Sequence, residues 1–108
     1  MEIAFGSRKL RDICINKDKA VEVLGPQVAR MLITTLADIR AAGNIIDLPY
    51  EVYFVDSFEK NNVVCSIKLT DFCCIELVSN HVLSAAPKLS SDWVSVYRLK
   101  LICITGVK

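Results

Sequence analysis

The chain has 108 residues, enough for one domain with a core of its own. Its hydrophobic content is 53% and it has only three prolines, a composition that indicates a compact globule and excludes a disordered chain. The formal net charge is only +1, so any contact with nucleic acid has to come from a local basic patch.

The first half of the chain predicts a short strand followed by helices. Residues 1–5 form a short apolar strand, and Ser7 can cap a helix that places Leu10, Ile13 and Cys14 on one side. A short helix is expected over residues 17–24. No export signal is expected, because the basic residues near the start are followed by mixed, charged sequence instead of an apolar stretch.

The longest predicted helix covers residues 26–42. Gly25 ends the preceding helix, and a proline at the first helical position opens this one. Apolar side chains recur at three- and four-residue intervals, which predicts one buried stripe made of Val28, Met31, Leu32, Leu36 and Ile39. Gly43-Asn44 is expected to end the helix.

The second half predicts strands. Residues 51–55 and 72–79 are candidates, and residues 63–69 alternate apolar and polar side chains. A loop over residues 80–92 precedes a last strand that is expected to run from Trp93 to Lys108. The order predicts a single α+β domain over residues 1–108, in which two to three helices pack on a mostly antiparallel sheet of four to five strands.

The five cysteines predict buried, reduced thiols. They are Cys14, Cys65, Cys73, Cys74 and Cys103. An odd number of cysteines in a chain without an expected export signal favours free thiols and a cytoplasmic protein. A metal site is the alternative, but no C-x-x-C pair is present, and two adjacent cysteines of a strand point to opposite faces. We therefore expect no metal and no other cofactor.

No apolar run approaches the roughly 18 to 20 residues that span a bilayer, so no membrane contact is expected.

Four stretches of the sequence form a pattern that goes beyond the order of elements. Residues 3–14 combine an apolar start with a lysine-containing helix, and residues 25–32 open the main helix with Ala29 and Leu32. Residues 36–49 end that helix and lead into a Leu-Pro linker, and the last stretch runs from Trp93 onward. Together these stretches resemble the RelE/ParE/HigB toxin superfamily, and in particular its HigB-like killer-protein branch.

This resemblance implies a RelE-like fold and a function. The chain would be the toxin of a type II toxin–antitoxin pair, acting as a ribosome-dependent mRNA interferase. Its partners would be a helix-turn-helix antitoxin, the ribosome and mRNA.

Three departures from the family pattern support an alternative function. The turn over residues 56–62 and the segment over residues 72–76 both lack the usual arginine, and Val107-Lys108 stands in place of a terminal Tyr-His pair. The alternative is a catalytically degenerate member that blocks a target, or sequesters an antitoxin, without cleaving RNA. An unrelated small α+β interaction protein is a third interpretation.

The basic residues of the sheet half are the candidate site. Cleavage of an RNA backbone needs a base, a cation near the phosphate and an acid for the leaving oxygen. Lys68, Arg98 and Lys108 are the candidates for catalysis, and RNA binding is expected from Lys60, Lys68, Arg98 and Lys100. Arg98 and Lys100 share one face of the last strand because they lie two residues apart. A solvated, charged sheet face is the alternative interpretation.

Four further side chains carry weaker expectations. Trp93 is expected to anchor the core. Tyr53 and Tyr97 could stack on RNA bases, but cross-strand or core packing is the favoured interpretation. His81 is the only histidine, and we expect it to be a surface loop residue instead of a catalyst.

Overall fold

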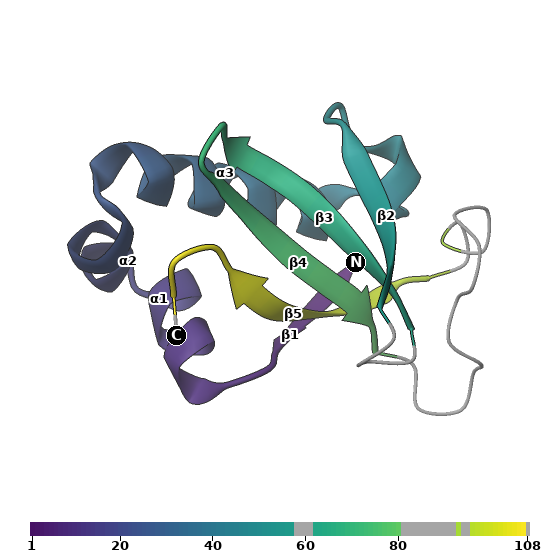
Figure 1. Cartoon of the computed structure of the whole chain (residues 1–108), viewed down its shortest axis with the longest axis horizontal. Helices are drawn as coiled ribbons and strands as arrows, with labels where there is room; N and C mark the ends of the chain where they lie inside the picture. The colour runs from purple at the N-terminus through teal and green to yellow at the C-terminus, as the bar shows by residue number, and fades with distance from the viewer. Residues whose placement is uncertain (58–61, 81–92, 94–95, 108) are drawn as a thin grey trace.

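The computed structural model describes residues 1–57, 62–80, 93 and 96–107, and these form an α+β domain with three α-helices and one five-stranded sheet (Figure 1). The elements in chain order are β1 (Glu2–Phe5), α1 (Arg8–Ile15), α2 (Lys17–Leu24), α3 (Pro26–Ala41), a 3-10 turn η1 (Ile45–Asp47), β2 (Val52–Ser57), β3 (Asn62–Thr70), β4 (Cys73–Ser79) and β5 (Arg98–Ile104). The predicted fold class and the predicted order of elements are confirmed.

The sheet has the strand order β1-β5-β4-β3-β2. All neighbouring strands are antiparallel except β1 and β5, which run parallel, with Glu2 opposite Arg98 and Phe5 opposite Leu101. The last strand in the chain therefore lies inside the sheet, between the first strand and β4.

Local capping explains where the helices begin. The Ser7 hydroxyl accepts a hydrogen bond from the Leu10 amide at 3.2 Å, which confirms the predicted cap of α1, and the Asn16 side chain caps α2 in the same way. Gly25 joins α2 to α3 with φ of +86°, a conformation that side-chain-bearing residues rarely adopt. This tight connection places α2 and α3 side by side.

The buried stripe of α3 differs from the predicted one. Its buried residues are Ala29, Leu32, Thr35, Leu36 and Ile39, whereas Met31 is 38% exposed and Val28 is only partly buried. The stripe is rotated toward small side chains because α2 packs beside α3, and an alanine permits a closer approach than a methionine does.

The helices cover one face of the sheet, and α3 runs behind β3 and β4 in Figure 1. Along β3, Val63, Cys65, Ile67 and Leu69 are buried in the main core while Lys68 is exposed, which confirms the predicted alternation for the second half of the strand. Val64 departs from it, because this side chain is only 4% exposed. No helix in the part of the chain that the structure describes is long and apolar enough to cross a membrane.

The last strand is shorter than predicted. It covers only Arg98–Ile104, and Thr105 and Gly106 form a turn in which Gly106 has φ of +84°. Trp93 lies outside the strand, yet it is 0% exposed and its ring centroid is 5.4 Å from that of Phe54. The prediction that Trp93 anchors the core is confirmed, but the prediction that it begins the last strand is wrong.

Candidate functional site

The candidate site is the open face of the sheet, which carries the side chains of β2 to β5 that point away from the helices. Lys68 and Lys100 each lie between two buried neighbours along their strands, whereas Tyr53 lies between two partly buried ones. The site residues that the structure places on this face are Tyr53, Lys68, Arg98 and Lys100.

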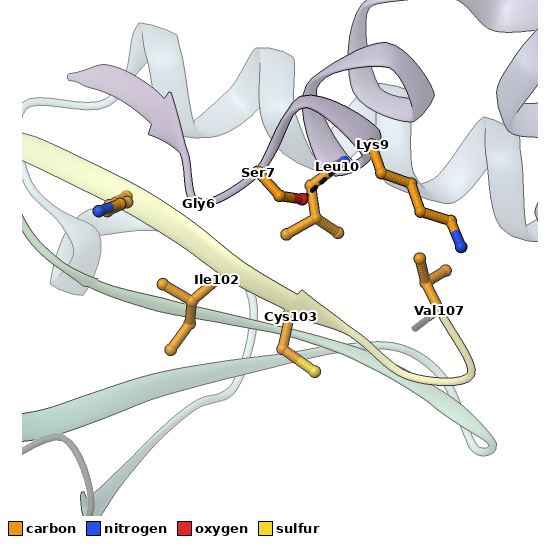
Figure 2. Close-up of a pocket in the computed structure, with 8 residues that line it drawn as sticks. Gly6, Ser7, Lys9, Leu10, Ile102, Cys103 and Val107 are labelled. Carbon is orange, nitrogen blue, oxygen red and sulfur yellow. Dashed lines mark hydrogen bonds between the residues drawn. The ribbon is translucent and has the colours of Figure 1, made fainter.

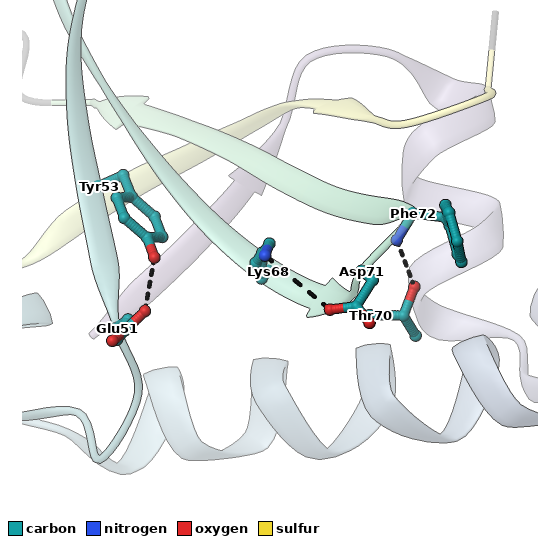
Figure 3. A network of polar contacts seen from close by, with 6 residues as sticks. All are labelled: Glu51, Tyr53, Lys68, Thr70, Asp71 and Phe72. Carbon is teal, nitrogen blue, oxygen red and sulfur yellow. Dashed lines mark hydrogen bonds and ion pairs between the residues drawn. The ribbon is translucent and has the colours of Figure 1, made fainter.

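At one end of the open face, Lys68 lies among polar and aromatic side chains (Figure 3). Its Nζ is 4.0 Å from Oδ1 of Asp71, in the turn that follows β3. The amide of Phe72 donates a hydrogen bond to the Thr70 hydroxyl at 3.2 Å, and the Phe72 side chain is 91% exposed. This end of the face thus combines a partly neutralised cation with an exposed aromatic ring.

Tyr53 lies on the edge strand β2, opposite Ser66 of β3, and is 46% exposed. Of the two predicted kinds of packing, core packing is therefore wrong, and cross-strand packing stays a prediction. The Tyr53 hydroxyl donates a hydrogen bond to the Glu51 carboxylate (Figure 3). This hydrogen bond, together with the negative charge of Glu51, raises the pKa of the Tyr53 phenol. A phenol held in its protonated form is a poor base for activating an RNA hydroxyl.

At the other end of the face, Arg98 begins β5. Its Nε is 3.0 Å from Oε2 of Glu2 on β1, and its guanidinium carbon lies 5.5 Å from the centroid of the Tyr97 ring. Tyr97 is half-exposed and precedes β5, so it does not pack in the core, and the prediction that it is a strand residue is wrong. Lys100 is partly buried on the same face of β5 as Arg98, as predicted.

The structure does not bring all the candidate cations together. The Cα atom of Lys68 pairs with Cys74 of β4, whereas that of Lys100 pairs with Val78 of the same strand. These two positions on β4 are four residues apart, which corresponds to about 13 Å along the strand. Lys68 therefore starts from a part of the sheet well separated from Lys100, and its Nζ lies beside Asp71 in the turn after β3.

Lys100 also lines a cavity of about 290 Å³ where β1 passes into α1 (Figure 2). Gly6 permits this passage, because a Cβ atom at Gly6 would lie 3.2 Å from the Leu101 carbonyl oxygen. The lining also includes Lys9, the Ser7 hydroxyl and the Cys103 thiol, and none of its described residues carries a side-chain carboxylate or an imidazole. The described lining therefore does not supply the base and acid that RNA cleavage needs.

Two of the five thiols are buried, as predicted. Burial raises the pKa of Cys14 to about 11 and that of Cys65 to about 12, so both thiols stay protonated and unreactive at neutral pH. The prediction of burial fails for Cys73, Cys74 and Cys103, which are only partly buried. The Cys74 sulfur lies 3.2 Å from the hydroxyl oxygen of Thr105. Burial, followed by the neighbouring thiols, raises the pKa of Cys73.

Three further predicted residues, Lys60, His81 and Lys108, lie outside the described residues. Within the described ranges, no group of three or more His, Cys, Asp or Glu side chains could hold a metal ion.

The distribution of charge along the sequence is a signal that the site prediction did not use. Residues 8–40, which form the helices, contain seven basic and four acidic side chains. The remaining residues, which include all five strands, contain six basic and eight acidic side chains. The helical segment is therefore net positive and the sheet half is net negative, which disfavours the sheet half as a phosphate-binding surface.

Comparisons of the chain with protein-family models, with curated proteins and with solved structures returned no match.

Proposed function

We propose that the chain is a toxin-type protein of the RelE/ParE/HigB kind that acts in the cytoplasm by binding and blocking its target, without cleaving RNA. The observation that carries this proposal is the pairing of the candidate catalytic cations. Lys68 lies 4.0 Å from the Asp71 carboxylate, and Arg98 lies 3.0 Å from that of Glu2. The two cations stand on different strands, and among the residues that the structure describes neither is joined to both a base and an acid.

The exposed side chains of the open face favour binding to a protein target. Tyr53 and Val55 project from the edge strand with 46% and 54% of their surface exposed, and Phe72 projects from the β3–β4 turn. Aromatic side chains are enriched at protein interfaces because they bury a large area at a small cost in conformational entropy. An antitoxin of the helix-turn-helix kind would neutralise such a protein, as the resemblance implies.

Inducible expression in bacteria tests the proposal, with growth and transcript 5′ ends followed together. We expect growth arrest with transcripts whose 5′ ends are unchanged. New ribosome-dependent cleavage sites would contradict the binding mechanism and support the mRNA interferase. Normal growth at full protein level would contradict a toxin-type function altogether.

Two substitutions test whether the open face binds the target. The double variant Tyr53→Ala, Phe72→Ala is expected to abolish arrest, because an interface loses most of its affinity when its aromatic anchors are truncated. Ile46→Ala is the matched control, since Ile46 is 47% exposed but belongs to η1 and not to the open face. The measurement is the growth rate at equal amounts of soluble protein. Arrest that persists in the double variant would place the target contact elsewhere.

A further inference from the structure

A groove of about 320 Å³ lies between α2 and α3, in the helical layer. Its apolar lining includes Val21 of α2 together with Pro26 and Ile33 of α3. Val21 and Pro26 are exposed and Ile33 is partly buried, so these side chains present apolar surface to solvent. Its volume is at the lower end of the range for ligand pockets, about 300 to 1,000 Å³.

The shape of the groove follows from how α2 and α3 pack together. Ala20 and Ala29 are fully buried where the two helices approach, so the helices pack through small side chains and leave the larger apolar ones at the rim of the contact. The positive φ of Gly25 fixes the connection between the helices at one end of the groove. Its shape therefore depends on rigid elements and not on a loop.

The charges around the groove are of one sign. Lys17 of α2 and Arg30 of α3 line it, and none of the lining residues that the structure describes carries a carboxylate. Among the residues that the structure describes, neither of these two side chains has an ion-pair partner, whereas Lys19 on the same helix lies 3.9 Å from Glu22. The groove also belongs to the net positive segment of the chain.

We propose that this groove binds a partner protein through a short segment that is acidic and carries an apolar anchor. The apolar side chain of that segment would lie on Val21, Pro26 and Ile33, and its carboxylates would pair with Lys17 and Arg30. An apolar side chain laid in a groove with charged pairs at its edge is a common mode of peptide recognition. This inference goes beyond the proposed function, because it concerns a second surface and holds whether or not the open face blocks a target.

The lining favours a peptide over a nucleic acid. Single-stranded nucleic acids bind through aromatic platforms on which bases stack, and the groove contains no aromatic side chain. A nucleic-acid duplex binds through many phosphate contacts, whereas the described lining of the groove supplies two cations, Lys17 and Arg30, beside exposed apolar side chains. Apolar surface of this kind gains free energy when another apolar side chain covers it.

A random peptide library displayed on phage, with members of about 12 residues, tests the inference on the full chain; such a peptide is long enough for about three helical turns. We expect selection to enrich sequences with Asp and Glu around one or two aliphatic residues. The enriched peptides, once synthesised, should bind the Lys17→Glu, Arg30→Glu double variant about tenfold more weakly or worse, since two exposed ion pairs are replaced by repulsion.

Lys19→Glu is the matched control, because it makes the same change of charge on α2 but lies outside the groove lining. It should reduce the affinity much less than the double variant does, because Lys19 lies outside the groove lining and pairs with Glu22 at 3.9 Å. The milder Lys17→Gln, Arg30→Gln variant should give an intermediate loss. Far-UV circular dichroism and the unfolding midpoint check that each variant is folded.

Three outcomes would overturn the inference. They are selection that enriches no peptide, enriched peptides that lack acidic residues, and binding that the Lys17→Glu, Arg30→Glu variant leaves unchanged. A U15 RNA oligonucleotide is tested in parallel. Binding of this RNA that the same double variant abolishes would assign the groove to nucleic acid and also overturn the inference.

Discussion

Replacing Trp93 with alanine is expected to lower the free energy of unfolding by about 3–5 kcal/mol, the range for deleting a fully buried aromatic side chain. Trp93 has no exposed surface, and its ring contacts that of Phe54 on the edge strand β2. The loss combines the transfer of apolar surface with the cavity that remains, because β2 is fixed by its ladder to β3 and cannot collapse onto the site.

Urea unfolding followed by circular dichroism measures this loss, since the substitution removes the only tryptophan and with it the fluorescence signal. Phe72→Ala is the control, because it truncates an aromatic ring that is 91% exposed and should change the stability by less than about 0.5 kcal/mol. Equal losses in the two variants would mean that Trp93 does not anchor the core. A Trp93→Phe variant should recover most of the stability.

The stability of the domain is expected to fall above pH 9 because of its buried thiols. Burial raises the pKa of Cys65 from 9.0 to about 12 in the folded protein. Its protonated thiol contributes stability that is fully present below pH 9 and is lost as the pH rises toward 12, because only the unfolded chain releases the proton in that interval. One such group gives a slope of about 1.4 kcal/mol per pH unit.

Urea unfolding between pH 8 and about pH 11 measures this slope. Cys65→Ala should be less stable at pH 8, since it leaves a cavity, but its stability should fall less steeply with pH. Cys14 acts in the same direction, because its pKa rises from 9.0 to about 11. Cys74→Ala, at a partly buried position, is the control and should keep the slope of the parent chain. A Cys65→Ala slope equal to that of the parent would contradict this explanation.

The features of the fold that could be predicted are those that local physics determines. Ser7 caps α1 because a hydroxyl satisfies a free helix amide wherever the helix begins. The alternation along β3 predicts its buried face because side chains of a strand point to opposite sides. Periodicity places Met31 in the buried stripe of α3, which is wrong. Periodicity gives only the spacing of the apolar side chains, whereas the packing of α2 beside α3 determines which of them are buried.

The candidate site could be predicted only in part, because it depends on register. That Arg98 and Lys100 share a face follows from their spacing. The distance between Lys68 and Lys100 depends on the register of β3 and β5 against β4. Local sequence patterns do not determine that register. The pairing of Arg98 with Glu2 required the parallel contact between the first and last strands.

The position of β5 has a consequence for how the protein folds. Because β5 joins β1 to β4, the chain before Arg98 can form the antiparallel β2–β3–β4 unit, but β1 has no strand to pair with. Closing the contact between β1 and β5 spans almost the whole chain, and such non-local contacts slow folding. During synthesis, β4 therefore keeps an unpaired edge until β5 has been made, and this intermediate is the one most exposed to aggregation and to capture by chaperones.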